Sequence, residues 1–184
     1  MNKKSIFLFL FAILITSGLR ANEVQEPDVK DLTIRERFFV GGFIGLQFGT
    51  QTAINVSPTA GFRFTNRLSA GVGGTYQYYN DRFFGRSFST HVYGYSFFAR
   101  FSILRRVFLH AELEQLSLKS RNEEFLGDPG ERYWETNRFL GAGYRQPLSE
   151  RVWFNIMVLY NFNEDSRAYF QNPIFRFGID VALR

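Results

Sequence analysis

The sequence predicts an all-β protein, an eight-stranded antiparallel up-and-down transmembrane β-barrel preceded by a signal peptide. Three observations lead to this prediction. Eight segments alternate apolar residues with polar or small ones, no charge interrupts the apolar run of any segment, and glycines gather on the polar faces. A period of two indicates a strand with two unlike faces.

The eight segments follow one another from residue 38 to the end of the chain. In the last of them, Phe175 and Ile179 belong to an unbroken apolar set, while Arg176 and Asp180 belong to the alternate set. Pro58, which has no N–H for a strand ladder, predicts a bulge in the second segment. We expect strands over residues 38–49, 52–64, 68–79, 91–103, 107–118, 137–146, 152–162 and 173–184.

The composition of the polar faces decides which side of each strand looks inward. These faces hold charged residues and ten of the 16 glycines in the chain. Exposed strand faces of soluble proteins avoid glycine, whereas the narrow interior of an eight-stranded barrel needs small residues. We therefore expect the polar faces to line a lumen and the apolar faces to contact lipid. A soluble ligand-binding barrel of lipocalin type would need the reverse arrangement.

The connections predict an orientation in the membrane. Short links at residues 65–67, 104–106 and 147–150 alternate with long polar ones at 80–90, 119–136 and 163–172, apart from a tight first hairpin at 50–51. Membrane barrels have short periplasmic turns and longer external loops, so both termini should be periplasmic. Aromatic residues gather toward the strand ends, with aliphatic residues and alanine between them, which predicts two aromatic girdles.

The N-terminal residues predict export. Lys3 and Lys4 precede ten apolar residues at 6–15, and small residues follow up to Ala21. This pattern is typical of a cleaved secretory signal peptide. We divide the chain into a signal peptide (residues 1–21), a flexible periplasmic lead-in (22–36) and an outer-membrane β-barrel (37–184), and we expect the protein in the outer membrane.

Several stretches resemble a known family. The segment "SPTAGFRFTNRLSAGVGGTYQYYN" resembles the strand-turn-strand of small outer-membrane β-barrel domain proteins of the Bacteroidetes type, and "GAGYRQPL" and "NIMVLYNFN" are similar to their later strands. The overall plan resembles the OmpA/OmpX-like eight-stranded barrel. The resemblance implies an architecture and not an activity, since such barrels serve as anchors, adhesins, lipid enzymes and narrow channels.

The inward-facing charges are the main candidate site. An isolated buried charge is costly, so these residues must be paired or solvated. Arg100 and Glu112 are expected on adjacent strands at similar heights, and two further charges share the last strand. The predicted lumen polar network consists of Arg63, Arg100, His110, Glu112, Glu114, Arg145, Asn155, Arg176 and Asp180. Such a network would fill the lumen. The alternative function is that of a narrow channel for a small solute or ion.

Two other chemistries have weaker support. Ser89 and His91 share one strand face near the outer rim and, with Asp165 as an acid, could serve an outer-leaflet lipid-modifying enzyme. No nucleophile motif surrounds them. The carboxylates within residues 123–131 lack the residue order of a calcium loop. We therefore expect no catalytic residue, no metal and no cofactor.

The remaining composition narrows the function. The chain has no cysteine, and its formal charge of +5 is spread along the sequence without a Lys/Arg run longer than two. Neither disulfides nor nucleic-acid binding are predicted. We expect a monomeric, non-enzymatic barrel with a structural or surface-interaction role. Its expected partners are outer-membrane lipid and an unknown protein or surface ligand at the extracellular loops.

Overall fold

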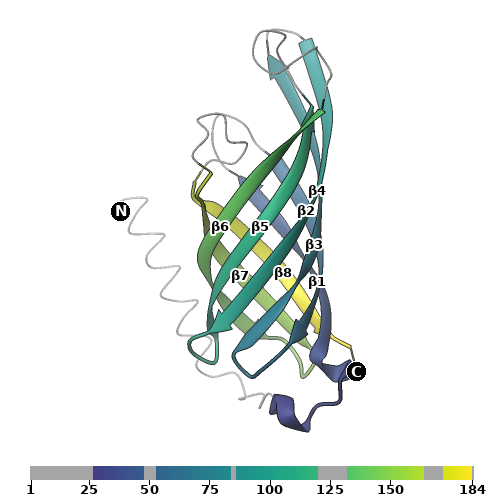
Figure 1. Ribbon diagram of the computed structural model, residues 1–184. Helices are drawn as coiled ribbons and strands as arrows, with labels where there is room; N and C mark the ends of the chain where they lie inside the picture. Colours follow the sequence, from purple (N-terminus) through teal and green to yellow (C-terminus); the bar gives the residue numbers. More distant parts are fainter. Residues whose placement is uncertain (1–26, 48–52, 84–85, 120–131, 164–171, 184) are drawn as a thin grey trace, which may run out of the picture.

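The strands form one closed wall. The computed structural model describes residues 27–47, 53–83, 86–119, 132–163 and 172–183. Within these residues, eight antiparallel strands pair with their neighbours in sequence, and the first pairs with the last (Figure 1). They are β1 (Phe38–Gln47), β2 (Ala53–Arg63), β3 (Leu68–Phe83), β4 (Arg86–Ser102), β5 (Val107–Lys119), β6 (Arg132–Pro147), β7 (Val152–Asn161) and β8 (Ile174–Ala182). The prediction of an eight-stranded up-and-down barrel is confirmed.

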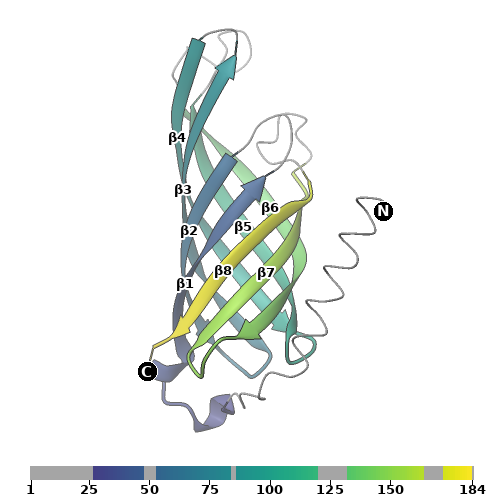
Figure 2. The same cartoon turned by 180° about the vertical axis from the view of Figure 1, so that it is seen from behind.

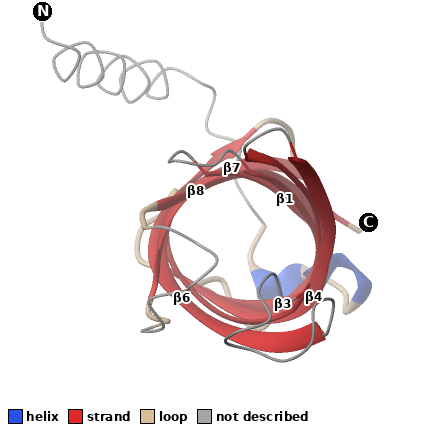
Figure 3. Ribbon diagram, turned by 90° about the horizontal axis from the view of Figure 1, so that it is seen from above, coloured by secondary structure: helices blue, strands red, loops and turns tan. Residues whose placement is uncertain are grey.

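The register of the strand pairs sets the width of the barrel, which appears as a closed ring when seen from above (Figure 3). The path that starts at Phe38 and passes at each strand to the paired residue on the next strand reaches Tyr160 on β7. The path must then move back by two residues to Val158, which pairs with Phe175 on β8. Phe175 pairs with Leu46 on β1, so the path returns to β1 eight residues beyond Phe38. The wall therefore closes with an offset of ten residues. In an eight-stranded barrel this corresponds to strands tilted by roughly 40° and an interior that side chains can fill.

The outside of the wall is apolar. Side chains that are each at least 40% exposed include Val40, Ile44, Val56, Val72, Phe97, Leu113, Leu140, Val158 and Ile179, contributed by all eight strands. So large an apolar surface exceeds the patches that soluble monomers expose and fits contact with lipid. The exposed Arg138 on β6 departs from this pattern. Its backbone oxygen accepts a hydrogen bond from Phe162, just past the end of β7, so it lies at the edge of the apolar band.

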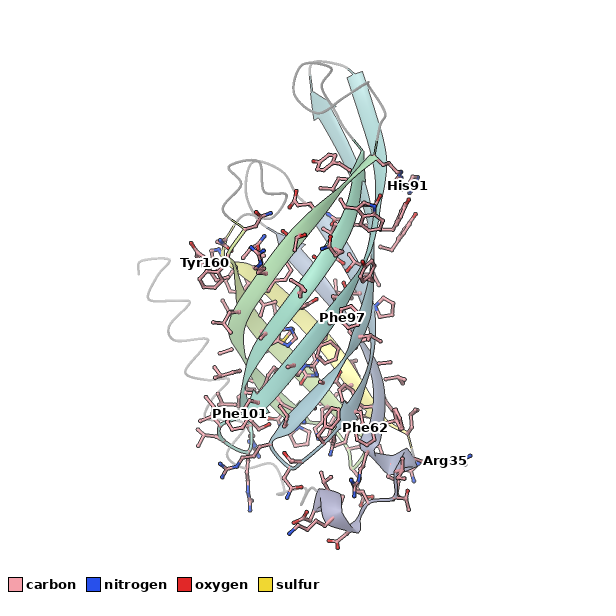
Figure 4. All side chains as sticks on the ribbon, viewed as in Figure 1. Arg35, Phe62, His91, Phe97, Phe101 and Tyr160 are labelled. Atoms are coloured by element: carbon pink, nitrogen blue, oxygen red, sulfur yellow. The ribbon has the colours of Figure 1, made fainter. Side chains whose placement is uncertain are left out.

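Aromatic side chains gather at both edges of the apolar surface. We call the end with the short turns at 64–67, 103–106 and 148–151 the lower end, as it is oriented in Figure 1. Phe62 and Phe101 lie near the lower end, Tyr160 near the upper end, and Phe97 between them, where aliphatic residues were expected (Figure 4). Ring pairs form at both edges, such as Phe38–Phe62 with centroids 4.8 Å apart and Tyr160–Phe162 at 4.9 Å. The arrangement corresponds to the two girdles expected from the sequence.

Two strands project past the others at the upper end (Figures 1 and 2). β3 and β4 pair as far as Phe83 and Arg86. Among the described residues, the pairing of β2 with β3 extends as far as Tyr78, and that of β5 with β4 begins at Tyr93. The prediction of a loop over residues 80–90 was therefore wrong for most of that stretch, which forms a two-stranded ribbon. Outside lipid neither face of a strand must be apolar, so the alternation that identifies strands fades there.

The strand boundaries differ from the prediction at two other places. β6 begins at Arg132, five residues before the expected start at 137. The bulge expected at Pro58 is absent: β2 keeps one register with β1 through Pro58, and its pairs with β3 at Val56 and Thr59 also share one register. The β2–β3 pairing simply omits residues 57–58. The predicted first hairpin at 50–51 lies outside the described residues.

The chain already has structure before β1. Residues 27–37 contain two 3-10 turns, η2 (Val29–Asp31) and η3 (Arg35–Arg37), at the lower end of the barrel (Figure 2). Val29 and Leu32 are buried, and the backbone N–H of Val29 donates to Oδ1 of Asn66 at 2.8 Å. The described part of the lead-in predicted over residues 22–36 packs on the β2–β3 turn. Its flexibility stays a prediction.

The outward face of β7 offers a test of the lipid-facing assignment. Val158, midway along β7 and 44% exposed, should tolerate arginine poorly, with a loss of about 2–4 kcal/mol of unfolding free energy, because a charge at the bilayer midplane is costly. Leu148→Arg in the adjacent lower turn should cost only about 0–1 kcal/mol. Urea unfolding of both variants in phospholipid vesicles measures the difference. Equal losses would contradict a bilayer around β7.

Candidate functional site

The predicted network residues lie inside the barrel. Arg145 is half-buried. The other eight are buried: Arg63, Arg100, His110, Glu112, Glu114, Asn155, Arg176 and Asp180. They alternate along their strands with exposed or half-exposed outer residues. The polar interior is therefore built by the same period of two that makes the outside apolar.

Four of the phenylalanines that line the lumen each face a glycine directly opposite on the neighbouring strand. The pairs are Phe39–Gly61, Phe98–Gly71, Phe108–Gly143 and Phe43–Gly178. A Cβ atom on any of these glycines would come within 2.2–2.6 Å of the opposite ring. The glycines let the rings lie against the wall, which leaves the centre of the lumen for another group.

The group at the centre is the guanidinium of Arg100. Its Cζ atom lies 4.5 Å from the ring centroid of Phe98, 5.1 Å from that of Phe43, 5.7 Å from Phe39 and 5.8 Å from Phe108. Arg100 is 1% exposed. At these distances a cation is attracted to the face of an aromatic ring, and the attraction strengthens when water is excluded.

Asp180 on β8 is the anionic partner of this cation. Nη1 of Arg100 lies 2.6 Å from Oδ2 of Asp180. The same oxygen accepts a hydrogen bond from Nδ2 of Asn155 at 3.0 Å, and Nη2 of Arg145 lies 3.7 Å away. Nε of Arg145 in turn donates to Oδ1 of Asn155 at 3.4 Å. One carboxylate thus joins side chains from β4, β6 and β7 across the lumen.

A second ion pair lies beside the first. Nη1 of Arg176 on β8 is 2.6 Å from Oε2 of Glu112 on β5. Nε2 of His110 is 2.9 Å from the same oxygen, and Arg176 lies over the ring of Phe139 at 4.9 Å. The His110 ring stacks on Phe98, with centroids 5.7 Å apart, and so connects this pair to the rings around Arg100.

Glu114 takes part in a chain of polar contacts nearer the upper end. It is fully buried, and its Oε1 accepts a hydrogen bond from Oγ1 of Thr75 at 2.6 Å. The Thr75 hydroxyl lies 3.5 Å from that of Ser57, which donates to Oδ1 of Asn55 at 2.8 Å. These contacts fasten β5 to β2 and β3 across the interior.

Apolar side chains also lie inside the barrel toward its upper end. Five residues from β4, β5, β7 and β8 are at most 5% exposed and belong to one packed cluster, with Tyr133 against it. They are Val92, Leu116, Leu118, Leu159 and Ile174. The described lumen therefore holds the ion pairs in its lower part, and above them this apolar cluster together with the buried polar side chains of Gln77, Asn137 and Asn161.

The partners within the network differ from the expected ones. Arg100 and Glu112 do lie on adjacent strands, but the residue opposite Arg100 is His110, and the carboxylate that Arg100 reaches is Asp180. Inward side chains on adjacent strands have neighbouring Cα atoms and extend in the same direction. Long side chains on opposite sides of the lumen extend toward each other, so their terminal groups come into contact. The Phe98–Gly71 pairing could have been found only from the register of β3 and β4.

The other candidate chemistries gain no site within the described residues. His91 is exposed on the outer side of β4, with Nδ1 2.8 Å from the hydroxyl of Tyr76. The side chain of Ser89, Asp165 and the loop carboxylates at 123–131 lie outside the residues whose side chains are described. In the described ranges, no three acidic or histidine side chains are grouped to hold a metal ion, and no helix is long and apolar enough to cross a membrane.

Comparisons with known proteins support the fold. No family model and no curated protein matches the chain. The N-terminal β-barrel domain of OprF from Pseudomonas aeruginosa is similar, with a TM-score of 0.50 and 14% identity over 80% of this chain and 96% of that domain. Neisserial surface protein A (TM-score 0.48, 18% identity, 79% and 96% covered) and Ail of Yersinia pestis (0.44, 18%, 78% and 97%) are also similar. The chain has the eight-stranded fold of small outer-membrane β-barrels, as the sequence predicted.

The fit between rings and glycines can be tested within one strand. A Cβ atom at Gly71 would lie 2.3 Å from a backbone oxygen of Ala60 and 2.6 Å from the Phe98 ring, whereas at Gly74 the nearest atom is 3.9 Å away. Gly71→Ala should lower the unfolding free energy by about 1–3 kcal/mol through overpacking. Gly74→Ala should leave it unchanged or raise it slightly. Urea unfolding of the refolded variants decides, and similar losses at both positions would count against the packing described here.

The second ion pair can be tested by removing one partner and then both. Glu112→Ala should cost about 3–5 kcal/mol of unfolding free energy, because it leaves the buried charge of Arg176 uncompensated. Combining it with Arg176→Met should recover much of that loss. Asp31→Ala, at an exposed carboxylate before β1, serves as the control and should change little. A double variant less stable than Glu112→Ala would contradict a coupled pair.

Proposed function

We propose that the chain is a small outer-membrane β-barrel with a structural or surface-interaction role and a closed lumen. The observation that carries this proposal is the filled interior. Arg100, Asp180, Glu112 and Arg176 are each at most 9% exposed and contact one another in pairs across the lumen. A conducting pore needs a water-filled path lined by polar groups. The apolar cluster at the upper end also argues against such a path.

The outer surface supports residence in a membrane. Its exposed apolar residues extend over every strand, and aromatic rings border them at both ends. With the short turns in the periplasm, the β3–β4 ribbon points outward from the cell. The signal peptide, the monomeric state and the bacterial group remain predictions from the sequence.

The β3–β4 ribbon is the surface we assign to an external partner. β3 and β4 pair with each other beyond the last described pairs that they form with β2 and β5. The ribbon therefore projects at the end of the barrel that the predicted orientation places outside the cell, where a protein or a surface ligand can reach it. We propose no enzymatic activity.

Electrical recording tests the closed lumen. Purified full-length protein, refolded into planar bilayers, should give no steady, reproducible conductance level, while a porin in the same bilayers gives open steps. A stable open level in the wild type would overturn the closed lumen and favour the small-solute channel. Fractionation on a density gradient gives the companion result, because the protein should travel with outer membranes and need detergent for release.

A further inference from the structure

Two arginines stand on the outer face of β6 toward its upper end. Arg132 and Arg138 are both exposed, and Trp134 and Thr136 lie between them on the same face of the strand. Six residues of an extended strand span roughly 20 Å, so the two charges lie far apart along β6. A ligand that contacts both of them must therefore be long, and the groups between the two arginines show its character.

Arg138 places a charge at the margin of the lipid-facing surface. Leu113 is its partner on β5, Leu140 follows it on the same face of β6, and Phe162 lies beside it; these three side chains are 45–52% exposed. Within the described parts of the chain, Arg138 forms hydrogen bonds through its backbone, with Oδ1 of Asn161 and with the N–H of Phe162. Among these residues the guanidinium is left to a group outside the chain.

An aromatic pair lies between the two arginines. Trp134 is 57% exposed, and its ring centroid is 6.0 Å from that of Tyr95 on β4, which is 50% exposed. Between Arg138 and this pair, Nε2 of Gln115 donates to Oγ1 of Thr136 at 2.8 Å, which adds a neutral polar step. Exposed aromatic rings with polar tips suit sugar rings, which have flat apolar faces edged by hydroxyl groups.

Arg132 is held above the aromatic pair by contacts with neutral groups. Its Cζ lies 4.4 Å from the ring centroid of Tyr93. Its Nη1 donates to the backbone oxygen and Oγ of Ser117 at 3.3 and 3.2 Å, and its Nη2 donates to the backbone oxygen of His91, which is labelled in Figure 4, at 3.3 Å. None of these partners carries a negative charge. A side chain that is already positioned loses less conformational entropy when an anion binds.

We propose that this face of β4, β5 and β6 binds a phosphorylated glycolipid of the outer leaflet. Its acyl chains lie against Leu113 and Leu140, and a phosphate on its sugar meets Arg138. The planar fork of arginine matches phosphate oxygens in bidentate geometry. The sugar rings continue upward onto the Trp134–Tyr95 pair, four residues or roughly 13 Å along the strand from Arg138.

The order of groups along β6 favours a glycolipid over a phospholipid. Upward from the apolar band, the face offers a cation, a neutral polar step, two aromatic rings and the second cation of Arg132. A sugar headgroup with a phosphate at each end has the same order. A phospholipid carries its phosphate next to its acyl chains and would use Arg138 alone. Binding of this kind requires the proposed residence in the outer membrane with the upper end outward, and it does not require a closed lumen.

Lipid A, an acylated glucosamine disaccharide with a phosphate at each end, is the probe. Full-length protein is reconstituted in phosphatidylcholine nanodiscs that contain lipid A, dephosphorylated lipid A or phosphatidylglycerol. Native mass spectrometry measures the lipid that stays bound after release into detergent. Arg138→Gln removes the guanidinium, and Arg151→Gln removes an exposed arginine from the lower end as the matched control. Trp134→Leu keeps an apolar side chain but removes the flat ring.

Retention of lipid A should fall by at least about tenfold in Arg138→Gln, against less than about threefold in Arg151→Gln. Arg138→Lys, which keeps the charge but not the fork, should show an intermediate loss and guards against misfolding as the cause. Trp134→Leu should lower retention of lipid A by about threefold or more and leave that of phosphatidylglycerol unchanged.

Three results would overturn the glycolipid site. They are equal losses in Arg138→Gln and Arg151→Gln, wild-type protein that retains phosphatidylglycerol or dephosphorylated lipid A as well as lipid A, and wild-type protein that retains none of the three. Each of them leaves the proposed function standing if the protein has entered the nanodiscs. A protein that cannot be inserted into nanodiscs at all would overturn the membrane residence as well as the site.

Discussion

One guanidinium group at the centre of the barrel sets the conditions for the rest of the interior. Arg100 is 1% exposed, so it needs an anion and a surrounding surface that tolerates a cation. Asp180 supplies the anion and four phenylalanine rings supply the surface. In an eight-stranded barrel these rings fit only because a glycine stands opposite each one. The excess of inward glycines is thus a packing requirement of the arginine's surroundings.

The polar contacts also tie together strands that are distant in sequence. Arg100 and Asp180 are 80 residues apart, and Arg176 and Glu112 are 64 apart. β8 contributes one member of each pair, so docking of this strand completes both ion pairs as it closes the wall against β1. Buried ion pairs add little net stability but penalise wrong arrangements, because a misplaced strand leaves charges unpaired. The network therefore favours one closed register over its alternatives.

The features that could be predicted from the sequence are those that depend on the local alternation of apolar and polar residues. Strand number, pairing order and the inner or outer direction of side chains follow from the period of two, which acts on every residue within the bilayer. Prediction from the sequence failed where that constraint is absent, in the ribbon around residues 80–90. It also could not assign Asp180 to Arg100, since contacts across a lumen depend on the closing register and on side-chain length.

The two ends of the interior differ in what the described residues place there. Toward the upper end an apolar cluster that includes Leu116 and Leu159 lies beside buried polar side chains. At the lower end the short turns surround a hollow that Arg145 lines together with other residues. Arg145 also lies 3.7 Å from the carboxylate of Asp180, so it connects the lower end of the barrel to the central ion pair.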